Sequence, residues 1–473
     1  MRTLGSNAIY NILYKSLNAL FPLVTMAYVS RVLLPVGVGK VASAQNIVSY
    51  FVIIASLGLP TYGVKKIAEC FDEREKRSKT FSELAVINAI STLICICVYL
   101  GIVLGIDYFE DKLLISFIVG IQLFANIFNI DWFYQGIEEY RYIMFRSFIV
   151  KLLALASVFI FVHNANDFPI YALIVTLSLV SNYIFNVVNL HKYVDFQYNG
   201  LDVSRHLKPV FVLLATTIAI EIYTLADTTM LSLFKGDEIV GYYTNSAKTV
   251  GIARVMIAAA SAVFLPRLNY YLSHGKELEF ESLAFKGLSM LLTLSLPVAV
   301  GLMLLAEDCT LIMFGKEFEA TILSMQILTV SVVTIAISNF TGYQILVSLG
   351  KETIVLYSTI IGAIINVVLN VLLIMPYGHY GAAIASVVTE FVIAAYQLYY
   401  VNKYIPLSLK SIVKQTFLPL VAMVSVVYVT KLLFDNIYIQ TVIAVLLGSI
   451  TYLFLCIASG NETITLLKNK CKK

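Results

Sequence analysis

Charged side chains lie inside long apolar stretches of this sequence, where a charge is costly. Seven of them fall within or near the ends of such stretches, namely Lys15, Asp131, Glu221, Asp227, Lys248, Arg254 and Glu390. An unpaired charge at the centre of a membrane helix costs about 2.5–3.5 kcal/mol, so residues of this kind usually serve a site. Lysine and arginine bind phosphate through charge-assisted hydrogen bonds, and carboxylates in a membrane pair with cations or carry protons. The pattern predicts that these charges serve a site inside a membrane rather than standing idle.

Simpler roles stay open for four of these residues. Lys15 and Asp131 could snorkel toward water or sit at the membrane interface. Asp227 and Lys248 could form an ion pair that serves only the structure.

The composition indicates that a lipid bilayer is the solvent. Of the 473 residues, 59% are hydrophobic and 13% are charged, and the mean hydropathy is +0.85. A soluble domain has about 45–50% apolar and about 25% charged residues, because its outside must be covered with polar groups. The net charge of +4 is too small for a surface that binds nucleic acid.

Fourteen apolar stretches are long enough to cross a membrane, since a crossing helix needs about 20 residues. Their approximate limits are 8–30, 41–64, 81–106, 113–135, 147–163, 169–190, 209–234, 242–265, 283–306, 321–349, 355–375, 381–401, 416–434 and 437–459. The sequence therefore predicts an all-α integral membrane protein.

The orientation of these helices follows from the basic residues, which are retained on the cytoplasmic side. With the N-terminus inside, 23 of the 33 Lys and Arg residues fall in inner segments and five in outer loops. We therefore expect both termini in the cytoplasm, which requires an even number of helices.

An internal repeat relates the two halves of the chain. Residues 39–48 align with residues 241–250, and Ser30 then falls on Ser232. Both halves begin on the same side, so the repeat is parallel, and the halves would face each other across a central cavity. We expect one six-helix bundle at 1–208, a second at 209–401, and two peripheral helices with a basic cytoplasmic tail at 402–473.

Polar residues at helical spacing predict which faces line that cavity, because such groups turn toward protein or water. The first helix has Asn11, Lys15, Asn18, Pro22 and Thr25 on one face, the seventh has Thr217, Glu221, Thr224 and Thr228, and the tenth has Ser331, Thr334, Ser338 and Thr341. Packing between helices also explains stripes of Ser, Thr and Asn. The mid-helix residues Pro22 and Pro297 each remove a backbone hydrogen bond, so we expect them to act as hinges.

Several kinds of chemistry have no visible motif in this sequence. No Gly-Lys pair stands in a phosphate-binding loop, so no ATPase is expected. The five histidines have neither HExxH spacing nor neighbouring cysteines, and we expect them to be solvated surface residues rather than metal ligands. The predicted loops are short, and a catalytic domain or a cofactor has no place in them. We expect a transporter and not an enzyme.

The arrangement resembles a known family of transporters. A six-plus-six parallel repeat with two added helices, Lys15 and Pro22 in the first helix, and the stretch from Leu225-Ala226-Asp227 to Gly241-Tyr242-Tyr243 are similar to polysaccharide flippases of the Wzx type. These belong to the superfamily of multidrug and oligosaccharidyl-lipid exporters. The resemblance implies a bacterial plasma-membrane protein that moves undecaprenyl-diphosphate-linked oligosaccharide repeat units by alternating access, for capsule, exopolysaccharide or O-antigen assembly. It also implies polysaccharide polymerase and chain-length proteins as partners.

The predicted cavity site follows from the polar faces and the repeat. We expect Lys15, Asn18, Asn46, Glu221, Asp227, Lys248 and Arg254 to bind the substrate, with the cations holding the diphosphate. Glu221, Asp227 and Glu390 are candidates for coupling to protons or sodium, and an uncoupled flippase is equally compatible with them. The alternatives are a cation-coupled multidrug extruder of the same architecture and a membrane polymerase or ligase acting on lipid-linked sugars.

Overall fold

A computed structural model describes residues 4–197, 199–407 and 409–459, and every element in these residues is helical. In chain order the elements are α1 (Leu4–Ser56), α2 (Leu59–Ala68), α3 (Arg74–Gly105), η1 (Asp107–Lys112), α4 (Leu113–Ala125), η2 (Asn126–Phe128), α5 (Asp131–Gly136), α6 (Tyr140–Phe161), η3 (Ala165–Asp167), α7 (Phe168–Leu190), α8 (Ser204–Lys235), α9 (Asp237–Ala262), α10 (Leu265–Ser273), α11 (Glu277–Leu304), α12 (Ala306–Met313), η4 (Lys316–Phe318), α13 (Thr321–Asn339), the π-helix η5 (Phe340–Leu346), α14 (Glu352–Tyr377), α15 (His379–Val401), α16 (Leu409–Leu433) and α17 (Ile437–Ala458).

Twelve helices within the described residues are long and apolar enough to cross a membrane. The chain is therefore a multi-pass membrane protein, as predicted. The twelve do not include α8, and they count the segment from Phe21 to Ala68 once, although the sequence predicts two spans there. That segment contains a break at Leu34, where φ is 60° and ψ is 174°. Leu34 precedes Pro35, and a residue before proline is forced away from helical ψ.

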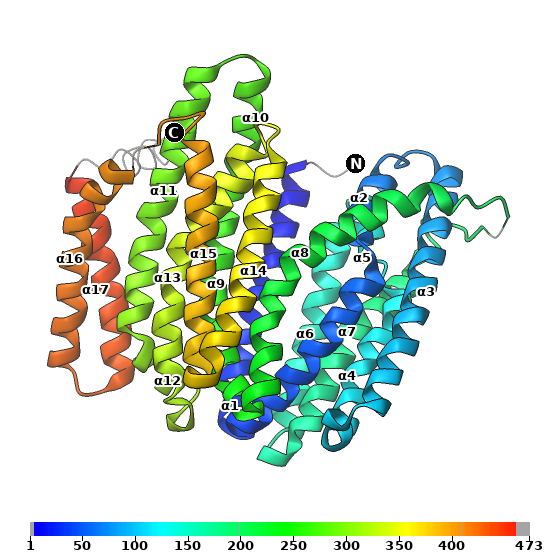
Figure 1. Cartoon of the computed structure of the whole chain (residues 1–473), viewed down its shortest axis with the longest axis horizontal. Helices are drawn as coiled ribbons and strands as arrows, with labels where there is room; N and C mark the ends of the chain where they lie inside the picture. The colour runs from blue at the N-terminus through cyan, green and yellow to red at the C-terminus, as the bar shows by residue number, and fades with distance from the viewer. Residues whose placement is uncertain (1–3, 198, 408, 460–473) are drawn as a thin grey trace. The chain divides into compact units, whose positions relative to one another are not determined.

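The chain divides into two compact units (Figure 1). The first contains α1 to α7, α8 as far as Ser232, and the start of α9 up to Gly241. Within it, α1 packs against α3, α4 and α6, and α7 packs against α4 and α6. The predicted boundary between residues 208 and 209 separates two halves that are related by the internal repeat. It stays a prediction.

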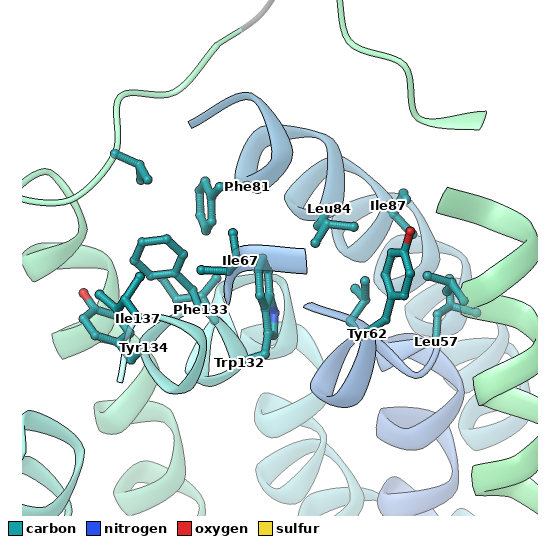
Figure 2. Packing of buried hydrophobic residues seen from close by; sticks show 14 of the residues in the cluster. Leu57, Tyr62, Ile67, Phe81, Leu84, Ile87, Trp132, Phe133, Tyr134 and Ile137 are labelled. Atoms are coloured by element: carbon teal, nitrogen blue, oxygen red, sulfur yellow. The ribbon is translucent and has the colours of Figure 1, made fainter. Parts of the chain in front are cut away.

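An aromatic cluster forms a core of the first unit where the short helices α2 and α5 meet α3 (Figure 2). Tyr62, Phe81, Trp132 and Phe133 are all buried there. Gly63 makes this packing possible, because a Cβ atom at that position would lie 2.4 Å from the Trp132 ring.

The second unit consists of the chain from Tyr242 onward, together with the short segment Leu233–Lys235 at the end of α8. Its helix α13 packs against α11 and α15, and α15 packs against α14. Helices α16 and α17, at the red end of the colour bar in Figure 1, pack against each other and against α11. The Tyr452 hydroxyl donates to the carbonyl of Thr293 at 2.8 Å, and Lys431 pairs with buried Asp308 at 2.7 Å. These two contacts attach the last two helices to the rest of the unit.

Candidate substrate site and its surroundings

The predicted residues of the seventh span lie on α8. Asp227 is buried, with 4% of its surface exposed, and Glu221 is half-buried. The Thr224 hydroxyl donates to Glu221 Oε2 at 3.0 Å. Helix α8 therefore carries two carboxylates about two turns apart.

Asn46 connects the second half of α1 to α8. Its amide nitrogen donates to the carbonyl of Leu225 at 3.2 Å and to Thr229 Oγ1 at 2.6 Å, and the Thr229 hydroxyl donates to the Tyr50 oxygen at 3.1 Å. Because these bonds occupy both amide protons, Asn46 positions the α8 turn that contains Asp227. A direct contact of Asn46 with substrate stays a prediction.

The first half of α1 holds three other predicted residues. The side chains of Lys15 and Asn18 lie outside the described residues. Pro22 lies inside α1 and is exposed, and the second predicted hinge, Pro297, lies inside α11.

The cationic residues of the predicted site both lie on α9. Lys248 is exposed and has neither a hydrogen bond nor an ion pair within the described part of its unit. Arg254 is half-buried, and its Nε donates to Ser331 Oγ of α13 at 3.0 Å. Ser331 is 0% exposed, so it fixes the guanidinium from a rigid position.

Glu390 of α15 completes this group in the second unit. It is 8% exposed, and an electrostatic interaction links it to Arg254. Arg254 of α9 is therefore bound by Ser331 of α13 and interacts electrostatically with Glu390 of α15. Asp227 belongs to the first unit and Lys248 to the second, and their predicted pairing stays a prediction.

Sequence reasoning missed the partner of Asp131. Arg146 of α6 is buried and pairs with Asp131 at 3.1 Å, and both groups also bind the side-chain amide of Asn186 on α7. Asp131 is therefore held by protein rather than left to snorkel. Arg146 stands one residue before the predicted limit of its span, which is why it was not counted among the intramembrane charges.

The expectation that all five histidines are solvated is wrong for two of them. His379 is buried and hydrogen-bonds to Ser324, and His206 is 3% exposed and shares a hydrogen bond of 2.9 Å with Glu83. On the other side of the ring, the Tyr62 hydroxyl bonds to His206 Nδ1 at 2.9 Å. Position near a helix end does not reveal burial when another helix covers that end.

Glu83, on α3, is the centre of this cluster. It is 0% exposed and accepts hydrogen bonds from the backbone of Asp202 at 2.8 Å, from His206 and from Arg205. The same face of α3 also holds the α7–α8 linker, because Ser82 Oγ accepts from the Gln197 backbone at 2.9 Å. The start of α8 is thereby fixed to α3. Asp202 itself is exposed, and the hydroxyl of Ser204 holds the pKa of its carboxyl below the usual range.

An apolar cavity of about 410 Å³ lies in the second unit between α11, α12, α16 and α17. Its wall includes Pro297, Met423 and Val445, and its few polar groups include Tyr452 and Cys309. Burial raises the pKa of the Cys309 thiol to about 11, so the thiol is neutral. The cavity suits a hydrocarbon rather than a polar ligand.

Within the described ranges, no three His, Cys, Asp or Glu side chains lie together in a group that could hold a metal ion.

Residues 4–271, more than half of the chain, match the model of the family described as polysaccharide biosynthesis protein. The chain belongs to the polysaccharide biosynthesis protein family. A second model, MatE, matches residues 213–372. The resemblance to polysaccharide flippases is thus confirmed.

Bacterial relatives agree with this membership in the polysaccharide biosynthesis protein family. A Shigella dysenteriae protein named "Putative O-antigen transporter" is 26% identical over 80% of this chain and 96% of its own length. Capsular polysaccharide biosynthesis protein CapF of Staphylococcus aureus is 24% identical over 82% of this chain and 96% of its own length.

Solved structures show the fold of this polysaccharide biosynthesis protein family member. The lipid II flippase MurJ, in an inward closed conformation, superposes with a TM-score of 0.76 at 16% identity, over 97% of this chain and 99% of its own. An inward-facing MATE family multidrug resistance transporter superposes with a TM-score of 0.66 at 16% identity, over 84% of this chain and 98% of its own. The chain has the fold that these transporters share.

Proposed function

We propose that this protein is a flippase that moves undecaprenyl-diphosphate-linked oligosaccharide repeat units across the bacterial plasma membrane by alternating access. The family membership and the names of the relatives support a role in polysaccharide assembly, and the likeness to MurJ supports a fold suited to a lipid-linked cargo. The product would be capsule, exopolysaccharide or O-antigen. A polymerase and chain-length proteins would use the exported units.

The observation that carries the proposal is the pair of cationic groups on α9. Lys248 is accessible, and Arg254 is held by Ser331 and interacts electrostatically with Glu390. A diphosphate carries the negative charge that such groups bind through charge-assisted hydrogen bonds. When a diphosphate binds Arg254, Glu390 loses part of its electrostatic partner, which makes it a candidate for ion coupling along with Glu221 and Asp227.

The lipid part of the cargo needs only an apolar path. A lipid tail can stay in the bilayer, and the cavity between α11 and the last two helices offers it further apolar surface. A sugar diphosphate cannot cross hydrocarbon unaided, because burying a charge without partners is prohibitive. A polar route lined by cations resolves this difference.

The finer topology is also part of the proposal. We infer fourteen membrane helices, two parallel six-helix bundles around a central cavity, two peripheral C-terminal helices, and both termini in the cytoplasm. The distribution of 23 basic residues in inner segments and five in outer loops supports this orientation. One chain contains both halves, so a monomer suffices for the mechanism.

A cation-coupled multidrug extruder is the second candidate, and the MatE match over residues 213–372 favours it. Such a cavity would bind organic cations and would use acidic and apolar groups. Lys248 has no ion-pair partner in the described part of its unit, and Arg254 lies on the same helix. These two positive charges would repel a cationic cargo, which argues against the extruder.

Deleting the gene and locating the lipid-linked oligosaccharide separates the candidates. Accumulation in the inner leaflet is expected for a flippase, whereas accumulation of single units in the outer leaflet would indicate a polymerase or ligase. A normal polymer, together with greater sensitivity to organic cations, would indicate the extruder.

Substitutions on α9 test the cationic site itself. Lys248→Ala and Arg254→Ala should reduce polymer export strongly at normal protein levels, and Arg254→Lys should preserve part of it. Lys276→Ala, which changes an exposed lysine in the α10–α11 loop, is the matched control and should export normally. Full export from well-expressed Lys248→Ala would remove that residue from the site.

A purely structural pair of Asp227 and Lys248 predicts a different result. Asp227→Asn and Lys248→Ala would each lower the amount of folded protein, and the double variant would restore it. Membrane levels and export of the two single variants and the double therefore decide between the two roles.

A further inference from the structure

Two glycines let the backbones of α1 and α9 approach each other very closely in the first unit. A Cβ atom on Gly39 of α1 would lie 1.6 Å from the carbonyl oxygen of Asp237, and a Cβ on Gly241 of α9 would lie 2.1 Å from the carbonyl oxygen of Pro35. Small residues allow backbones to approach in this way. We call this contact of Gly39 and Gly241 the glycine crossing.

The glycine crossing joins equivalent positions of the internal repeat. Gly39 and Gly241 are the residues that the repeat aligns, and each lies just before a predicted span in its own half of the sequence. A contact between equivalent residues lies near a pseudo-twofold axis. The crossing is therefore where one repeat meets the other within this compact unit.

Five polar side chains form a hydrogen-bonded cluster that includes Asp237 of the glycine crossing, and we call them the outer latch: Ser43, Tyr108, Lys112, Ser232 and Asp237. Lys112 Nζ donates to Asp237 Oδ1 and to Tyr108 Oη, both at 2.9 Å. The Ser43 hydroxyl donates to Asp237 Oδ1 at 2.9 Å, and the Ser232 hydroxyl donates to Ser43 Oγ at 3.0 Å. The Tyr108 and Ser232 hydroxyls share a hydrogen bond of 2.6 Å.

The outer latch is shielded from solvent. Ser43 is 2% exposed and Ser232 is 6% exposed, and the side chains of Lys112 and Asp237 are 20% and 11% exposed. Partners come from four elements, α1, η1, α8 and α9, so separating any one of them breaks several hydrogen bonds together. Hydrogen bonds to charged groups contribute more than neutral ones, which makes Asp237 the centre of the cluster.

We propose that the outer latch and the glycine crossing form the gate that closes the outward face of the transporter, and that the structure holds this gate shut. The identity of the cargo in this inference rests on the proposed flippase function. The opening and closing of the gate do not depend on that function. Ser43 and Ser232 lie at the outer ends of predicted spans. Tyr108, Lys112 and Asp237 lie in the predicted loops that the basic residues assign to the outer side. Release of any cargo at that side requires the two repeat-related helix starts to separate.

A reversible cross-link tests whether the crossing must open. Ser43→Cys with Ser232→Cys, in a variant whose native cysteines are replaced and which still exports polymer, places two thiols where the hydroxyl oxygens are 3.0 Å apart. Oxidation should stop export and a reductant should restore it, whereas each single variant should export under both conditions. Normal export from fully cross-linked protein would overturn the gate.

Thiol labelling tests the latch without any assumption about the cargo. A membrane-impermeant maleimide added from outside should modify Ser43→Cys slowly, because that position is buried while the gate is shut. Adding Asp237→Asn should speed labelling about tenfold, the factor that corresponds to about 1.4 kcal/mol. Lys112→Ala should act in the same direction, and Lys316→Ala, an exposed lysine of another predicted outer loop, should not.

The two proposals fail in different ways. Unchanged labelling in Asp237→Asn, or labelling of Ser43→Cys only from the cytoplasmic side, would overturn the gate and leave the flippase proposal standing. Faster labelling without any accumulation of lipid-linked oligosaccharide in the deletion strain would support the gate and overturn the flippase.

Discussion

Replacing Glu83 should destabilise the first unit more than any other single change near the α7–α8 linker. Its carboxylate is fully buried and receives three hydrogen bonds, from the Asp202 backbone, His206 and Arg205. Glu83→Ala removes the acceptor and leaves a buried imidazole and a backbone N–H without their partner. Leaving such donors unsatisfied costs free energy in addition to the lost bonds.

The magnitude follows from the exposure of each donor. A hydrogen bond to a charged group contributes about 1.5–3 kcal/mol, and this applies to the bonds from Asp202 and His206. The Arg205 side chain is 48% exposed, so water replaces most of its contribution. We expect Glu83→Ala to lower the free energy of unfolding by about 3–5 kcal/mol, and Glu83→Gln, which keeps one acceptor oxygen, by about 2 kcal/mol.

The assay is unfolding of the purified protein in mixed micelles, followed by circular dichroism. Glu75→Ala is the control, because Glu75 is an exposed residue of the same type on the same helix, and it should change the free energy of unfolding by less than about 0.5 kcal/mol. A loss below about 1 kcal/mol in Glu83→Ala would refute the reasoning, since it would mean that water reaches the carboxylate in the folded protein.

Three further predictions concern other parts of the chain. Pro22→Ala should leave membrane insertion intact and slow export, measured as polymer per transporter, and normal export would mean that this proline is not a hinge. Gly63→Ala should destabilise the protein by about 1–3 kcal/mol in the same unfolding assay, because the new methyl group overlaps the Trp132 ring. Lys431→Met should cost about 3 kcal/mol, because it leaves Asp308 buried without its partner, and Lys431→Met combined with Asp308→Asn should recover most of the loss on unfolding.

The sequence predicts the helices of this protein well because the bilayer imposes a simple requirement on them. Each crossing needs a long apolar run, so α6, α14 and α17 lie within a few residues of their predicted positions, apart from the first turns of α6. The break within α1 was harder to place. The sequence predicts a loop at 31–40 between two spans. The structure instead has helix on both sides of a single break at Leu34, next to Pro35.

Partners between helices could not be predicted in the same way. Hydropathy shows that Glu83, Arg146 and Asp237 are near membrane helices, but pairing depends on which faces of distant helices meet. Arg146 meets Asp131 and Asn186 only through the packing of three helices. The polar stripe on the tenth predicted span was more informative, since it includes Ser331, which holds Arg254.

The pairing of Arg146 with Asp131 has a consequence for the insertion of the nascent chain into the membrane. Asp131 precedes Arg146 by 15 residues, so it has already left the ribosome when α6 enters the bilayer. Asn186 follows 40 residues later and can only complete the group once α7 is made. The α5–α6 segment is therefore the shortest nascent piece in which the arginine has a counter-charge, and a ribosome-bound chain that lacks Asp131 should insert α6 less efficiently.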